Sequence, residues 1–116
     1  MWAVNGLEIK MIEGDYGVSL PITVCGAELL VNDVMKITIK DRVNGKEILS
    51  KIFNTFYPAP DMQSENKNNT FDLIFTKDDS DKLKTGAYVY ILDWYQNNVF
   101  MCNIVPSAPF RVVDKA

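Results

Sequence analysis

The feature that most constrains the fold of this chain is the dipeptide Asn44-Gly45, which separates two runs rich in β-branched residues. Asparagine and glycine both tolerate positive φ, so this pair is a strong short-range signal for a two-residue β-hairpin turn. The runs 34–43 and 46–53 are therefore expected to be antiparallel neighbours. A two-residue loop predicts a core-facing side made of four isoleucines: Ile37, Ile39, Ile48 and Ile52.

Short alternating segments of the same kind recur along the chain, each bounded by Gly, Pro, Asn or Asp. They predict further strands at 7–12, 18–24, 71–75, 87–95, 99–105 and 110–113. Pro21 cannot donate a backbone hydrogen bond, so its strand is expected at a sheet edge or a bulge. One short helical turn is expected at 77–83, with Thr76 as its N-cap. The pattern predicts one domain over residues 1–116, an all-β, immunoglobulin-like antiparallel β-sandwich of about seven or eight strands.

Residues 58–70 interrupt this alternation. Pro58 and Pro60 end the preceding strand, and the stretch 64–70 is polar and without periodicity. We expect a long exposed loop here, the most mobile part of the chain. It is not a domain boundary, because neither flank is large enough to fold alone.

The sequence contains no histidine, which removes the commonest general base and the Ser-His and Cys-His nucleophile pairs. It also lacks phosphate-binding and dinucleotide-binding glycine motifs. The acidic cluster Asp78, Asp79 and Asp81 favours helix capping over a calcium site, because it lacks the order of an EF-hand loop, and over catalysis. We therefore expect no catalytic, cofactor-binding or metal-binding residue.

The charge of the chain bears on its partners. The formal net charge is -3, whereas nucleic acids and anionic membranes select basic surfaces. No apolar run is long enough to span a bilayer, and the first residues lack the regions of a signal peptide. We expect a protein that is cytoplasmic when synthesised and binds neither nucleic acid nor membrane.

Cys25 and Cys102 both lie in apolar, strand-like runs. Buried free thiols are the favoured interpretation, because free cysteine packs as a small hydrophobic residue. A disulfide would require the two strands to face each other, and a cytosolic origin disfavours it. Two cysteines without histidine cannot build a four-ligand zinc site.

The segment that enters the strand at 87–95 has the pattern of a tyrosine corner. Gly86 follows a tight turn, and Tyr88 is placed so that its hydroxyl can bond back to a carbonyl within 82–85. The alternative is a simple surface tyrosine. The alternation predicts one face of this strand from four residues: Tyr88, Tyr90, Leu92 and Trp94.

Aromatic residues supply the candidate interface. Trp94 and Tyr95 are consecutive in one strand, so at most one of them faces the core. The other, together with Trp2, Phe56 or Tyr57, is a candidate for contacts with a loop or a neighbouring subunit. The alternative is a platform on which sugar rings stack, since exposed aromatics mark binding surfaces without naming the ligand.

Three groups of residues together carry a family resemblance. They are Gly14-Asp15 before an alternating strand, Asn32-Asp33-Val34 leading into Ile37-Thr38-Ile39-Lys40, and Phe75-Thr76-x-x-Asp79 continuing to Leu83-x-x-Gly86-x-Tyr88-x-Tyr90. This combination resembles the small β-sandwich domains encoded in phage and prophage tail regions of Gram-positive bacteria, among them the N-terminal domain of baseplate upper proteins. The resemblance extends over residues 7–113. Ile91 departs from it, standing where that pattern often has an acidic residue.

The resemblance implies a non-catalytic structural module of a tail or baseplate. Such a module would be a homo-oligomer, would bind other tail or baseplate proteins, and would end in the virion. The alternative from a different class is a carbohydrate-binding or host-adhesion module that uses exposed aromatics to hold a glycan. An enzyme is the least favoured of the three functions.

Overall fold

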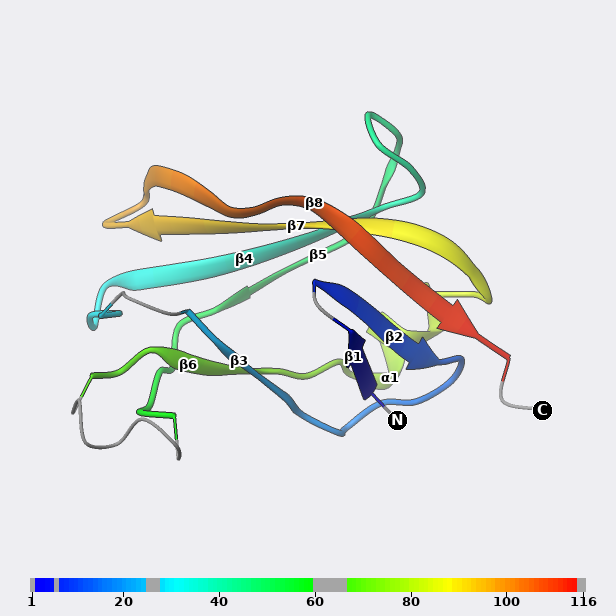
Figure 1. The fold of residues 1–116 in the computed structure, drawn as a ribbon, viewed down its shortest axis with the longest axis horizontal. Coiled ribbons are helices and arrows are strands. Elements are labelled where there is room, and N and C mark those ends of the chain that lie inside the picture. Colours follow the sequence, from blue (N-terminus) through cyan, green and yellow to red (C-terminus); the bar gives the residue numbers. More distant parts are fainter. Residues whose placement is uncertain (1, 6, 25–27, 60–66, 115–116) are drawn as a thin grey trace.

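The chain folds into two β-sheets and one short helix (Figure 1). The structure, a computed structural model, describes residues 2–5, 7–24, 28–59 and 67–114. In chain order the elements are β1 (Trp2–Asn5), β2 (Glu8–Ile12), β3 (Leu20–Thr23), β4 (Asp33–Lys40), β5 (Glu47–Phe53), β6 (Thr70–Leu73), α1 (Lys77–Asp81), β7 (Gly86–Gln96) and β8 (Val99–Val113). The predicted all-β class is confirmed.

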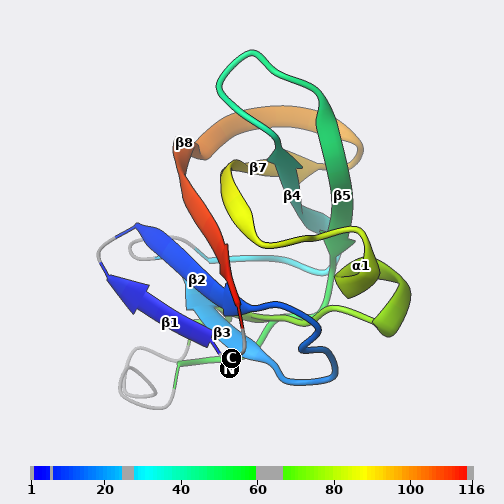
Figure 2. The same cartoon turned by 90° about the vertical axis from the view of Figure 1, so that its right-hand side faces the viewer.

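The larger sheet has six strands in the order β1-β2-β8-β7-β4-β5, and β3 pairs with β6 in a second, two-stranded sheet. Figure 2 shows the larger sheet curling over the smaller one, which makes the fold sandwich-like. The core lies between them. Its largest fully buried side chains include Met11, Leu29, Met35, Ile37, Ile39, Phe71, Leu73, Phe75, Phe110 and Val112. Tyr90 and Leu92 are buried, and Tyr88 and Trp94 pack against the core, so the predicted face of β7 is confirmed.

The hairpin between β4 and β5 forms where the sequence predicts it, but its register differs by one residue. Asn44 has a φ of 58°, yet the backbone amide of Gly45 bonds to Arg42 O (2.9 Å), and the loop is longer than two residues. Ile37 therefore pairs with Lys51 rather than with Ile52. Because a one-residue slip exchanges the two faces of a strand, Ile52 is 61% exposed instead of buried.

β8 is one continuous strand where the sequence predicts two segments separated by prolines. Pro106 and Pro109 are accommodated inside it, and the prediction of two strands was wrong. The prediction of a purely antiparallel sandwich was also wrong, because β2 runs parallel to β8, with Ile9 opposite Phe110. β1, which the sequence analysis did not predict, extends the sheet beyond β2.

The helix α1 forms for the predicted reason. The Thr76 side chain accepts a hydrogen bond from the backbone amide of Asp79, and the Asp79 side chain accepts one from the backbone amide of Thr76. This reciprocal capping box satisfies two of the donors that a helix start leaves without partners. Because the helix is so short, the cap contributes a large part of what holds it.

The predicted loop 58–70 lies mainly outside the described residues, which omit 60–66. The two ends of the segment are close together. Tyr57 and Thr70 form an isolated β-bridge, and the buried side chain of Asn69 accepts a hydrogen bond from the amide of Ala59. At these ends the backbone is therefore held against the core.

Candidate interaction surface

The predicted tyrosine corner is built at the start of β7. The hydroxyl of Tyr88 donates a hydrogen bond to Lys84 O at 2.7 Å, within the range of carbonyls expected from the sequence. A β-carbon on Gly86 would lie 3.7 Å from the Tyr88 ring, so the ring packs directly over the glycine. The half-buried ring also contacts the core, and the corner joins the turn after α1 to β7.

A second tyrosine bond was not predicted. The buried Tyr90 donates to Leu7 O (2.5 Å), which lies 83 residues away and leads into β2. Burial raises the pKa of Tyr90, because its charged form is poorly solvated. No pattern in the neighbouring sequence predicts a hydrogen bond between residues so far apart in the chain. The only signal was the repeated Tyr-x-Tyr, which placed both rings on the inner face.

The acidic cluster is divided between structural partners. Asp79 caps α1 and also forms an ion pair with Lys51, whose ammonium lies 6.0 Å from the centre of the Phe75 ring. Asp81 pairs with Lys77 at 3.1 Å on the exposed side of the helix. Within the described segments no group of three or more acidic or cysteine side chains could hold a metal ion. Asp79 and Asp81 thus make contacts that hold the helix.

The three aromatic residues predicted for an interface have different surroundings. Trp94 is half-buried and packs against the core. Tyr95 lies on the opposite face of β7, where its ring meets that of Phe100 edge-on at 5.7 Å between centroids. The backbone of Trp2 lies in β1, and its side chain lies outside the described residues. Of the two whose side chains are described, Tyr95 belongs to the outer surface.

An apolar surface that the sequence analysis missed lies at the end of the β7–β8 hairpin. Asn97 and Asn98, with φ values of 49° and 66°, turn the chain, and the Asn97 amide bonds to Asn32 O (3.3 Å). The segment before β4 is thereby held beside the hairpin (Figure 1). We call the exposed apolar side chains of these two segments the end patch: Leu30, Val31, Val99, Phe100 and Met101. Val31, at 89% exposure, has almost no contact with the rest of the protein.

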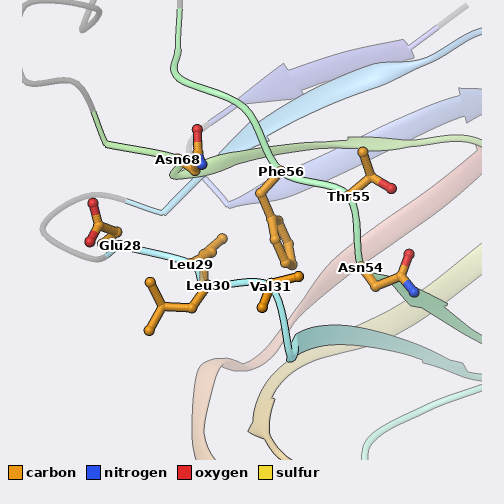
Figure 3. A pocket seen from close by; sticks show the side chains of 8 residues that line it. All are labelled: Glu28, Leu29, Leu30, Val31, Asn54, Thr55, Phe56 and Asn68. Carbon is orange, nitrogen blue, oxygen red and sulfur yellow. The ribbon is translucent and has the colours of Figure 1, made fainter.

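A shallow pocket of about 440 Å³ adjoins this patch. Its walls are the segment 28–31 and the segment 54–56 that follows β5, and Figure 3 shows Phe56 pointing toward Val31. Glu28 is its only charged lining residue among those described. Its other lining side chains are apolar, amide or hydroxyl groups.

Cys102 corrects a prediction, because it is exposed rather than buried. It lies in β8 opposite Trp94. Cys102 is a free thiol. Cys25 lies outside the described residues, so the prediction for it stays untested.

No protein-family model matches the sequence, and a search of curated proteins found no match. Among the described residues, no helix has the length and apolar character needed to cross a membrane.

Proposed function

We propose that this chain is a non-catalytic structural module that works by binding other protein subunits. The observation that carries the proposal is the end patch, where Val99, Phe100 and Met101 lie at one end of β8, on both faces of the strand, and are all about half or more exposed. Exposed apolar residues gathered at one end of a fold mark interaction surfaces, because leaving them in water costs free energy that a partner would recover.

The tyrosine corner and the Asp79 capping box support the same function. In both, polar side chains form hydrogen bonds to the backbone that stabilise the fold. The tyrosine corner joins the turn after α1 to β7, and the capping box holds the start of α1. A rigid sandwich that presents an apolar end is well suited to hold neighbouring subunits in a fixed arrangement.

We place this function in a phage or prophage tail or baseplate on the resemblance carried by Gly14-Asp15 and Leu83-x-x-Gly86-x-Tyr88-x-Tyr90. The partners would then be other tail or baseplate proteins, and the protein would be part of the virion. The net charge of -3 and the apolar end patch are compatible with a protein partner and offer nothing to a nucleic acid.

The test is direct binding between purified proteins. The products of the genes adjacent to this one would be expressed singly and titrated against the chain by calorimetry. We expect at least one tail protein to bind, and we expect Val31→Asp with Phe100→Asp to weaken binding at least tenfold. The control is Val43→Asp, which changes an equally apolar, exposed residue in the β4–β5 loop. Absence of binding, or equal weakening by the control, would overturn the proposal.

One observation favours a glycan as the second candidate ligand. The half-buried Tyr95 and the exposed Phe100 form an aromatic pair on the outer face of the large sheet, and sugars stack on aromatic rings. The edge-on geometry leaves little flat surface for two rings at once. A glycan array probed with the intact protein and with Tyr95→Ala separates the candidates, because binding that depends on Tyr95 would favour the adhesion function.

A further inference from the structure

The long strand β8 is paired on both sides along only part of its length. β7 pairs with it from Val99 to Val112, whereas β2 pairs with it only from Phe110 to Val113. On the side away from β7, the described residues offer no neighbour to the stretch 99–109. Alternate residues of a strand direct their amide and carbonyl groups to opposite edges. About half of this stretch therefore presents polar backbone groups to solvent.

We call residues 99–105 the open edge of β8. Pro106 and Pro109 have no amide hydrogen, so they end the part of the strand that can accept a full neighbour. Met101 and Ile104 are bulge residues without a partner on β7, while the other five residues of the open edge keep theirs. The backbone of this stretch is thus held by β7 on one side and available on the other.

The edges of β5, β3 and β1 carry features that discourage strand addition, and the open edge of β8 carries few. β5 turns the charged Lys51 toward the inside of the sandwich, β3 is short and contains Pro21, and β1 is also short. The open edge reads Val-Phe-Met-Cys-Asn-Ile-Val and has no charged residue. Its two bulges are its only such feature. A long uncharged edge of this kind attracts another strand.

An apolar groove runs beside this edge. Ile104 and Val105 form one wall, and Leu20 and Ile22 of β3 form the other, around a volume of about 500 Å³. The groove opens between the two sheets at the place where the larger one lacks a neighbour for β8. A strand added to the open edge would therefore place alternate side chains over this groove, where they would leave water.

From these observations we infer that the open edge of β8 pairs with the same edge of a second copy of this chain, in antiparallel orientation about a two-fold axis at Cys102. The inference rests on the proposed function, and it names a partner for that assembly. Each copy has a net charge of -3, so two copies repel each other least where both are uncharged. An isologous contact needs only a self-complementary strand.

The residues of the open edge satisfy that requirement. Cys102 is the midpoint of 99–105, so a two-fold axis there sets Val99 opposite Val105 and Phe100 opposite Ile104 of the second copy. Met101 faces Asn103, and Cys102 faces itself. Two of these pairs set apolar side chains opposite each other, Met101 meets an uncharged amide, and no like charges are directly opposite.

Light scattering coupled to size-exclusion chromatography tests the inference. We expect a particle of twice the 13.2 kDa chain mass, and we expect Met101→Lys to return it to one chain mass by placing one ammonium group on each side of the axis, inside the paired strands. The substitution should leave the fold intact, because Met101 is 47% exposed and has no partner on β7. Val43→Lys is the matched control and should remain dimeric.

A cross-linking experiment tests the axis itself. Residues directly opposite in an antiparallel pair have Cα atoms about 4.5–5.5 Å apart, a separation that a disulfide can bridge. In a Cys25→Ser background, mild oxidation should join two chains through Cys102, and Cys102→Ser should abolish the product. Failure to cross-link would overturn the axis at Cys102.

A monomeric wild-type protein, or a dimer that persists in Met101→Lys, would overturn the pairing. These results are distinguishable from failure of the proposed function. A monomer that still binds a tail protein through the end patch would keep that function and remove only the second copy as a partner.

Discussion

Replacing Asp79 by asparagine should destabilise the protein more than any other change in the acidic cluster. The carboxylate caps α1 through the Thr76 amide (2.9 Å) and forms an ion pair with Lys51. The side chains of Asp79 and Lys51 are only 16% and 24% exposed. Asparagine keeps the shape and an acceptor oxygen but removes the charge, so the ammonium beside Phe75 loses its counterion.

The magnitude follows from these two roles. Loss of an N-terminal cap lowers the free energy of unfolding by about 1 kcal/mol, and a weakened cap lowers it by part of that amount. A hydrogen bond to a charged group contributes about 1.5–3 kcal/mol, and the pair retains some contact with solvent, which reduces the value. Together we expect about 2 kcal/mol of lost unfolding free energy for Asp79→Asn. For a domain of this size that corresponds to a Tm lowered by about 8 °C.

The effect should depend on pH in a defined direction. Burial raises the pKa of Asp79, but the hydrogen bonds from Lys51 and Thr76 outweigh burial, and the resulting pKa lies below its ordinary value. A carboxyl whose folded pKa is lowered stabilises the protein above its unfolded pKa of about 3.9, and this contribution is lost as the pH falls through the folded value. The difference between wild type and Asp79→Asn should be full at pH 7 and shrink below about pH 4.

Urea unfolding followed by tryptophan fluorescence at several pH values measures the stability difference between wild type and Asp79→Asn. Asp78→Asn is the matched control, since Asp78 is in the same helical turn but has no bond to Thr76 or Lys51, and it should cost less than about 1 kcal/mol. A double-mutant cycle with Lys51→Met isolates the ion pair. A coupling energy near zero, or equal losses for the two asparagine variants, would refute the reasoning.

Three further outcomes are expected. Tyr88→Phe should lower stability by about 0.5–1.5 kcal/mol, because it removes the bond to Lys84 O without opening a cavity; an unchanged urea midpoint would contradict the corner. The hydrogen bond to Asp72, followed by burial, raises the pKa of Tyr57 to about 12. The stability that this bond contributes is therefore complete below the unfolded pKa of about 10 and is lost as the pH rises toward the folded pKa of about 12. Absorbance titration at alkaline pH should show Tyr57 and Tyr90 ionising later than an ordinary tyrosine, and Tyr57→Phe should remove one of these two late steps. Gly45→Ala should destabilise, because a β-carbon there would collide with the preceding loop, and a neutral effect on the thermal midpoint would argue against this loop geometry.

Local signals in the sequence predicted the local structure well. Asn44 and Gly45 located the hairpin, Thr76 located the start of α1, and the spacing from Gly86 to Tyr88 predicted a bond that lies within four residues. In each case the residues that determine the conformation are adjacent in the chain. The cause and its effect are thus both visible in one short window of sequence.

Features set by distant segments could not be predicted in this way. Pro106 and Pro109 indicated a break, but β7 supports β8 along nearly its whole length, and strand edges tolerate proline when the missing donor faces outward. The end patch was missed for a related reason. An apolar strand-like run such as 99–105 indicates a buried strand, and only the three-dimensional arrangement reveals that nothing among the described residues covers Val99, Phe100 and Met101.

A one-residue error in the predicted register of the β4–β5 hairpin changes which side chains are expected to face the core. A two-residue loop would have put Ile52 inside, with the lysine beside it in solvent. The longer loop turns Lys51 inward instead, opposite Ile37 on the core side of an edge strand. An inward ammonium at that position is tolerable only with a carboxylate close by, because leaving it without a counterion would cost its solvation. The capping residue Asp79 supplies that carboxylate, so the short helix α1 both covers the end of the core and stabilises the register of the hairpin.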